Sequence, residues 1–156
     1  MKIISKNNNL KKNTASNKKF GIVTSLWNKE ITDKLYEGCY STLIKYGAEK
    51  KNIVTLEVPG SFELIYGSKK ILEKSQLDAV IVIGSIIKGE TPHFEIISQS
   101  ISDGIKDLNI LFDIPFLFCV LTDLNMQQAR DRSGGKLGNK GSDCAIAALK
   151  LLENIS

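Results

Sequence analysis

The only histidine of the chain, His93, follows a short polar segment, residues 88–91, that contains lysine, glycine, glutamate and threonine. Because imidazole gains and loses a proton near neutral pH, His93 is a candidate proton-transfer group. A structural role for a lone histidine is an equally open alternative. The segment before it could bind an anion at the start of a helix, although many such loops bind nothing.

Two aromatic residues and one carboxylate stand at or near turns where a ligand could reach them: Trp27, Phe118 and Glu63. A flat ring suits a planar heterocycle, and a carboxylate accepts hydrogen bonds from hydroxyl groups. Each residue also has a simpler explanation. Trp27 could be an ordinary core or surface aromatic, and Phe118 could pack inside a strand. Glu63 could be favoured by the dipole of a following helix.

The segment 130–141 carries Arg132, Lys136 and Lys140 among glycines. This composition is typical of a flexible, solvated loop. The alternative is a cationic wall for a phosphate group, to which arginine would make paired hydrogen bonds. Composition alone leaves both interpretations open.

From residue 20 onward, two hydrophobic periodicities take turns along the chain. Continuous apolar runs predict buried strands, and apolar residues repeated every three or four positions predict amphipathic helices. The predicted strands are residues 20–26, 53–58, 78–87 and 115–121. The predicted helices are residues 31–43, ending near Gly47, then 62–72, 96–108, a short 125–132 and a final 142–153.

This alternation predicts an α/β fold, a three-layer αβα sandwich with a four-stranded parallel sheet of flavodoxin-like order. Ligands of such sheets bind beyond the carboxyl ends of the strands, so the candidate residues should converge at one edge. Three other ligand sites of this fold lack their sequence marks. The serine-rich FMN loop, the clustered aspartates of a receiver domain and the Gly-Lys-Ser/Thr phosphate loop are all missing.

Composition and charge argue against several classes of function. No apolar run reaches the ~18–20 residues of a membrane span, and the lysine- and asparagine-rich start resembles no export signal. Much of the net charge of +4 lies in residues 6–19, so only this tail supports nucleic-acid binding. We therefore predict a cytoplasmic protein that binds neither nucleic acid nor membrane, with the tail leaving the nucleic-acid alternative open.

The predicted domain organisation is simple. Residues 1–19 form a polar, solvated N-terminal arm, in which residues 1–5 could make a short strand, and residues 20–156 form one domain. Three widely spaced cysteines, Cys39, Cys119 and Cys144, form no CxxC pair. They predict buried free thiols, and not a zinc site or a disulfide framework.

Four sequence blocks together resemble the lumazine synthase family. They are Trp27-Asn28, residues 58–63 (VPGSFE), residues 84–94 (GSIIKGETPHF) and residues 132–141 (RSGGKLGNKG). The blocks follow the family's order and spacing, and the resemblance spans about residues 20–152. The second and third blocks are highly specific in combination.

The resemblance implies an enzyme of the penultimate step of riboflavin synthesis. It would condense 5-amino-6-(D-ribitylamino)uracil with 3,4-dihydroxy-2-butanone 4-phosphate to 6,7-dimethyl-8-ribityllumazine, with release of phosphate and water. His93 would transfer protons, and no metal or organic cofactor is implied. The pyrimidine and ribityl chain would be bound by Trp27, Ser61, Phe62, Glu63, Ser85, Ile86, Ile87 and Phe118. The phosphate would be bound by Glu90, Thr91 and Arg132, with Lys140 as a weaker candidate.

The resemblance also implies a homopentamer in which the Arg132 position serves the adjacent subunit. Many members build a 60-subunit icosahedral shell, which leaves riboflavin synthase open as an enclosed partner. The lack of inserted residues in 134–141 favours the shell, whereas the long polar segment 7–18 departs from the family's pattern. The alternative is a non-catalytic flavin-binding or shell-forming homologue, against which the intact His93, Glu63 and Arg132 count.

Overall fold

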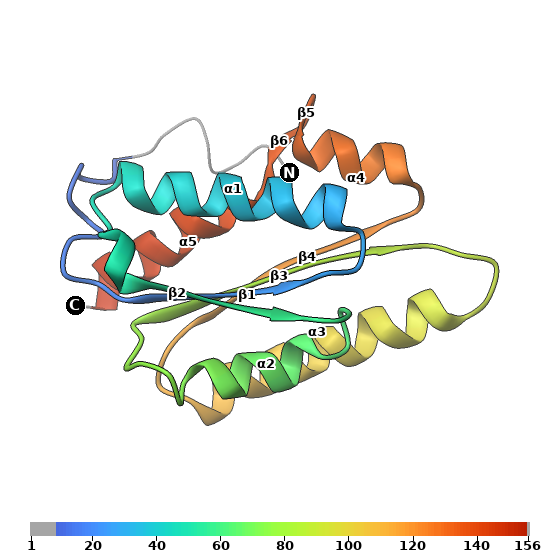
Figure 1. Cartoon of the computed structure of the whole chain (residues 1–156), viewed down its shortest axis with the longest axis horizontal. Coiled ribbons are helices and arrows are strands. Elements are labelled where there is room, and N and C mark those ends of the chain that lie inside the picture. Colours follow the sequence, from blue (N-terminus) through green and yellow to red (C-terminus); the bar gives the residue numbers. More distant parts are fainter. Residues whose placement is uncertain (1–8, 156) are drawn as a thin grey trace.

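The computed structural model describes residues 9–155 and contains one central parallel sheet (Figure 1). Its four strands lie in the order β2-β1-β3-β4. They are β1 (Phe20–Ser25), β2 (Ile53–Val58), β3 (Ala79–Ile87) and β4 (Phe116–Asp123). The order places β2 and β4 at the two edges and β3 in the interior of the sheet.

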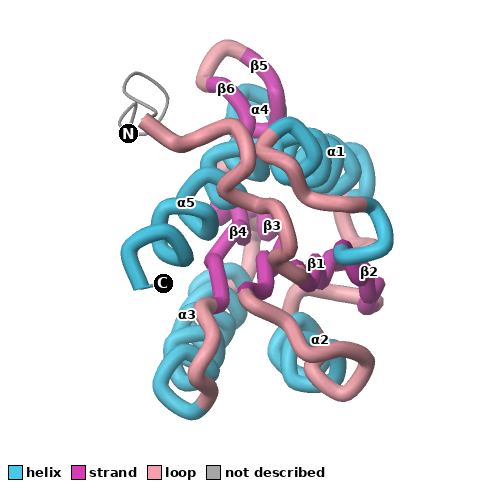
Figure 2. The backbone as a smooth tube through the Cα atoms, turned by 90° about the vertical axis from the view of Figure 1, so that its left-hand side faces the viewer, coloured by secondary structure: helices cyan, strands magenta, loops and turns pink. Residues whose placement is uncertain are grey.

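Helices cover both faces of the sheet (Figures 1 and 2). One face carries α1 (Lys29–Lys45), α5 (Lys140–Ile155) and the short α4 (Met126–Arg132), and the other carries α2 (Leu64–Ile71) and α3 (His93–Leu111). A single 3₁₀ turn, Lys50–Asn52, precedes β2. The three-layer αβα architecture and its parallel sheet confirm the predicted fold class.

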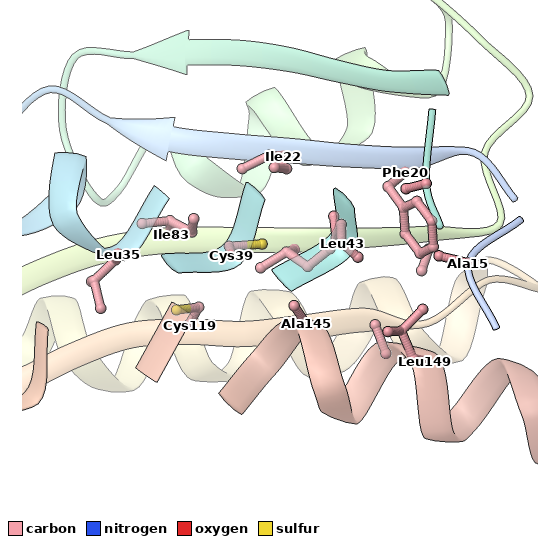
Figure 3. Packing of buried hydrophobic residues seen from close by; sticks show 14 of the residues in the cluster. Ala15, Phe20, Ile22, Leu35, Cys39, Leu43, Ile83, Cys119, Ala145 and Leu149 are labelled. Carbon is pink, nitrogen blue, oxygen red and sulfur yellow. The ribbon is translucent and has the colours of Figure 1, made fainter. Parts of the chain in front are cut away.

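Both faces of the central strands are buried, which explains their unbroken apolar sequences. In β3, Ile81 and Ile83 pack with α1 and α5, whereas Val80 and Val82 pack with α2 and α3. Figure 3 shows the first of these layers, where Ile83 lies close to the helix side chains. Each such buried side chain contributes roughly 1.5–3 kcal/mol, so the sheet interior is the main source of stability.

The helix that carries His93 begins earlier than the sequence predicts. His93 is the first residue of α3, whereas the hydrophobic stripe placed it in the preceding loop. Pro92 stands directly before it with a φ of −65°, the angle that a proline ring fixes and that an α-helix needs. The proline therefore starts the helix ahead of its first apolar residue.

The glycine- and lysine-rich segment is more ordered than its composition predicts. Residues Ser133–Gly135 (β5) and Gly138–Asn139 (β6) pair as a short antiparallel hairpin. The side-chain amide of Asn139 donates hydrogen bonds to the carbonyl oxygens of Lys34 in α1 and Ser133 in β5. Residues 134–138 are exposed to solvent, as the loop interpretation predicts, but their backbone is paired in a hairpin that is attached to α1.

The N-terminal arm is also partly packed. Ala15 is fully buried in the core beneath α1, and its amide donates to the carbonyl oxygen of Tyr46 at 2.9 Å. The interpretation of residues 1–19 as a solvated arm is thus wrong around Ala15, because its small side chain fits beside the end of α1. The possible strand at residues 1–5 lies outside the described residues. Among residues 9–155, no helix is both long and apolar enough to cross a membrane.

The three cysteines are all unbridged thiols, as predicted. Cys39 and Cys119 are buried between α1, β4 and α5 (Figure 3), but Cys144 is only partly buried. Burial raises the pKa of Cys39, and a hydrogen bond with Cys144 together with burial raises that of Cys119. Both buried thiols are therefore poor nucleophiles.

Replacing Gly141 by alanine should destabilise the fold, because the new methyl group would be driven into the backbone carbonyl of Leu35 in α1. A main-chain group cannot rotate away, so we expect the free energy of unfolding to fall by about 2–3 kcal/mol. Urea unfolding measures this change. Gly89→Ala is the matched control, because a Cβ there meets nothing within 4 Å. An equal loss in both variants would contradict this packing.

Candidate functional site

A cleft of about 320 Å³ lies at the carboxyl ends of β1 and β3, against the loop that follows β2 and the start of α3. This volume is within the range of small-molecule sites. We call it the strand-end cleft. It is lined by Trp27, Gly60, Ser61, Phe62, Glu63, Ser85, Ile86, Ile87, His93 and Ile97.

Trp27 is held at the mouth of the cleft by the turn between β1 and α1. Its backbone amide donates to the carbonyl oxygen of Pro59 at 3.2 Å. Asn28 adopts a left-handed conformation, with φ 56°, and its side-chain amide donates to the carbonyl oxygen of Ser85 at 2.9 Å. The indole itself is 69% exposed. A fixed backbone with an open ring face leaves Trp27 able to stack on a planar ligand.

Two buried serines stand at the polar floor of the cleft. Ser61 and Ser85 are at least nine-tenths buried, and neither hydroxyl oxygen has a hydrogen-bond partner among residues 9–155. A buried hydroxyl without a partner is costly, so these groups favour a ligand that can bond to them. Ile86 and Ile87 continue β3 beyond Ser85 and supply apolar wall beside it.

Glu63 and Phe62 form the side of the cleft that belongs to the turn before α2. A Cβ at position 60 would lie 2.9 Å from the Glu63 carboxylate, so the glycine there makes room for it. Phe62 is exposed, as Trp27 is. Two open aromatic rings and a carboxylate therefore face one hollow, an arrangement suited to a flat molecule with hydroxyl groups.

α3 contributes His93 and Ile97 to the opposite wall. The two residues are four positions apart, one turn of helix, and so face the same way. His93 is exposed at the rim, where its ring can meet both solvent and a bound ligand. The imidazole, the carboxylate of Glu63 and the indole of Trp27 thus share one cleft.

The residues that line the cleft include one acidic group and no lysine or arginine. The nearest basic residue in sequence, Lys88, forms an ion pair with Glu95 at 2.7 Å, and that hydrogen bond lowers the pKa of Glu95. Glu90 and Thr91 lie in the exposed turn before α3 and do not line the cleft. The described chain alone therefore presents no cation there to an anionic ligand.

The two predicted cations lie on other elements. Arg132 ends α4, where its Nη1 donates to the carbonyl oxygen of Gln128 at 3.1 Å. Lys140 starts α5 and pairs with Asp143 at 2.9 Å. Neither residue lines the strand-end cleft of its own chain.

Phe118 is likewise separate from Trp27. It pairs with Val82 in the middle of β4, five residues before the strand ends at Asp123, which is roughly 16 Å along a strand. It lines a different hollow, against α3, with Phe94 and Thr122 among its neighbours. Phe118 and Trp27 therefore do not meet within a single chain, because a strand pattern gives the face of a residue but not its distance from the end of the strand. That both rings contact one ligand stays a prediction.

Three contributors were not predicted as site residues. Gly60 and Ile97 line the cleft, and Asn28 holds the turn that carries Trp27. Ile97 could have been found from its four-residue spacing to His93. The role of Asn28 depends on a left-handed backbone and a contact with β3, which no local pattern reveals. Within the described part of the chain, no group of three or more potential ligands could hold a metal ion.

The chain is similar in sequence to proteins of one known family. The sequence model of the family described as 6,7-dimethyl-8-ribityllumazine synthase matches residues 17–156. A protein of that name from Flavobacterium psychrophilum is 56% identical over 146 residues, covering 92% of this chain and 77% of its own. Another from Christiangramia forsetii is 53% identical, covering 91% and 87%. A third, from Parabacteroides distasonis, is 49% identical, covering 88% and 86%.

Proposed function

This chain belongs to the 6,7-dimethyl-8-ribityllumazine synthase family of riboflavin biosynthesis, and from that premise we propose its reaction and site. An enzyme of this type is a transferase. The proposed substrates are 5-amino-6-(D-ribitylamino)uracil and 3,4-dihydroxy-2-butanone 4-phosphate, which condense to 6,7-dimethyl-8-ribityllumazine. The observation that carries the proposal is the shared cleft of Trp27, Glu63 and His93.

The pyrimidine binds against Trp27 in this proposal. The exposed indole offers a flat face, and the end of β3 at Ser85, Ile86 and Ile87 offers backbone and hydroxyl groups to the polar edge of the ring. The hydroxyl of Ser85 has no partner within residues 9–155, which supports a polar ligand there.

The ribityl chain extends along the turn before α2. Its hydroxyl groups bond to Ser61 and the Glu63 carboxylate, and Phe62 covers its carbon chain. A substrate without those hydroxyl groups would leave buried polar groups unpaired, which disfavours binding strongly.

The phosphate of the second substrate binds at the start of α3, where Glu90 and Thr91 precede the helix. A helix N-terminus attracts an anion through its unpaired amides, but a phosphate of this charge also needs a cation. Since none lines the cleft, we propose that Arg132, with help from Lys140, enters from a neighbouring copy of the chain. Phe118, exposed on the edge strand β4, would reach the neighbour's pyrimidine in the same way.

In the proposed reaction the 5-amino nitrogen attacks the ketone carbon and water leaves, which forms a Schiff base. Elimination then expels inorganic phosphate from the four-carbon unit. The ribityl-bearing nitrogen closes the second ring onto the remaining carbonyl, and a second water leaves. His93 takes and returns the protons that these steps move, while the cleft holds the two reactants together.

The quaternary structure belongs to the same proposal. A site completed by a neighbour requires an assembly of copies, for which we propose the homopentamer of the family. Several expectations stay predictions. They are the packing of pentamers into a 60-subunit shell, an enclosed riboflavin synthase, a cytoplasmic location, and the division of the chain into an arm and one domain.

Formation of the lumazine product tests the proposal. The two substrates are mixed with the protein, and the product is followed by its absorbance and fluorescence. Product formation above the rate without protein supports the enzyme. A non-catalytic flavin-binding homologue would give no acceleration but would bind riboflavin, so a parallel riboflavin titration separates the two.

Arg132→Ala should weaken use of the phosphate substrate. We expect its KM to rise about 10- to 100-fold, since a charged hydrogen bond is worth roughly 1.5–3 kcal/mol. The KM of the pyrimidine should change by less than about threefold, because Arg132 does not contact the pyrimidine in this proposal. Lys136→Ala is the control, because Lys136 lies in the same segment but pairs with Asp131. Equal effects on both substrates would contradict the assignment.

His93→Ala should lower kcat by about 100-fold while leaving activity above background. General acid–base catalysis supplies a factor of roughly 10²–10⁴, and positioning of the two substrates survives the substitution. Steady-state kinetics with both substrates saturating measures the change. An unaltered kcat would remove His93 from the proton transfers.

A further inference from the structure

A buried carboxylate at the end of β4 has no role in the reaction described so far. Asp123 is the last residue of the strand and is 5% exposed. Its Oδ2 forms no hydrogen bond within residues 9–155. The pKa of Asp123 is raised, because burial raises it more than the neighbouring Arg132 lowers it, so the guanidinium only partly offsets the cost of burying the charge. An ionised group in such a place needs a partner.

Arg132 is that partner. Its Nη1 lies 3.5 Å from Oδ1 of Asp123 and donates to the carbonyl oxygen of Gln128 at 3.1 Å. A guanidinium has five N–H donors, and both of these contacts are made by one of its nitrogens, Nη1. The group is therefore held at one end while most of its donors stay available to a ligand.

The strand end and α4 form one connected unit around this pair. The side chain of Asn125 accepts a hydrogen bond from the amide of Gln128 at 3.0 Å, and the side chain of Gln128 accepts one from the amide of Leu124 at 2.9 Å. These bonds connect the turn after Asp123 to the helix that carries Arg132. The distance between the carboxylate and the guanidinium is thus set by a short, hydrogen-bonded segment.

Neighbouring charges on α4 have other partners. Arg130 pairs with Glu30 of α1 at 2.9 Å, and Asp131 pairs with Lys136 at 3.1 Å. Among the ion pairs of the described residues, Asp123 is the only acidic partner of Arg132. Removing Asp123 therefore takes away the ion-pair partner of Arg132 and leaves its hydrogen bond to Gln128 and the other ion pairs of α4 in place.

We propose that Asp123 is a positioning residue that holds the Arg132 guanidinium in the orientation in which it receives the substrate phosphate. This inference rests on the proposed role of Arg132. A mobile arginine side chain loses much conformational entropy when it binds a ligand. A side chain that is already held in its bound orientation loses less, so it binds more tightly. The carboxylate contacts only Nη1 of the guanidinium, so it orients the group and leaves the other N–H donors available to a phosphate.

The opposite effect is physically possible and is distinguishable. A carboxylate beside the guanidinium also competes with phosphate for its charge. If competition outweighed orientation, removal of Asp123 would tighten phosphate binding. The 3.5 Å separation, longer than a direct charged hydrogen bond, and the bond of Arg132 to Gln128 favour orientation.

Asp123→Asn removes the charge and keeps the shape. We expect the KM of the phosphate substrate to rise about tenfold, equal to about 1.4 kcal/mol, with the pyrimidine KM and kcat within about twofold. Asp131→Asn is the matched control, because it removes a buried carboxylate on α4 that pairs with Lys136. It should leave all three constants within about twofold. An unchanged or lowered phosphate-substrate KM in Asp123→Asn, or an equal rise in the control, would overturn the proposal.

A double variant separates positioning from general damage to the fold. In an Arg132→Ala background, Asp123→Asn should change the phosphate-substrate KM by less than about twofold, because the group it positions is gone. A further tenfold rise there would overturn the proposal. If Asp123→Asn folds poorly, Asp123→Ser removes the same charge with less bulk and gives the same comparison.

Binding of inorganic phosphate tests the inference independently of the reaction. Equilibrium dialysis with labelled phosphate should show weaker binding to Asp123→Asn than to the unaltered protein and to Asp131→Asn. Equal or tighter binding overturns the inference. If the unaltered protein forms no lumazine yet shows this ranking, the proposed reaction fails and the positioning role of Asp123 stands.

Discussion

Burial of both faces of one parallel sheet is the constraint on which the rest of the structure depends. Helices must cover β1 and β3 on both sides, and because the strands are parallel, each connection runs from the carboxyl end of one strand to the amino end of the next. The only places where polar side chains can gather beside the central strands are their ends. Trp27, Glu63 and His93, far apart in sequence, meet there because the strands that precede them run parallel.

The same constraint leaves the cleft electrostatically incomplete. The strand-end cleft collects a carboxylate and an imidazole, whereas Arg132 lies at the end of α4 beside Asp123 of β4, and Lys140 lies at the start of α5. A lone chain thus separates the parts that suit a sugar-bearing pyrimidine from the part that suits a phosphate. The association of copies that we propose would unite them.

Much of this could be predicted from the sequence, because periodicity reports burial. The apolar runs 20–26, 53–58 and 78–87 predicted the strands. The turns after the first two contain Trp27 and Glu63, and the end of the third contains Ser85, so the three residues were expected to be neighbours. Tertiary contacts left no such pattern. Ala15 is buried by the end of α1, and Phe118 lies too far from the strand end to join Trp27. The burial of Asp123 beside Arg132 depends on how α4 packs, so the spacing of residues in the sequence does not predict it.

Mixing two defective variants tests the central claim, a site shared between copies, most directly. Glu63→Ala removes a residue of the strand-end cleft, and Arg132→Ala removes the residue proposed to bind the phosphate. Assemblies of the two variants are dissociated, mixed and allowed to reassemble. Mixed assemblies should form more lumazine than the separate variants together, because some sites join an intact Glu63 to an intact Arg132 of a neighbour. Activity no higher than that sum would show that each site lies within one chain.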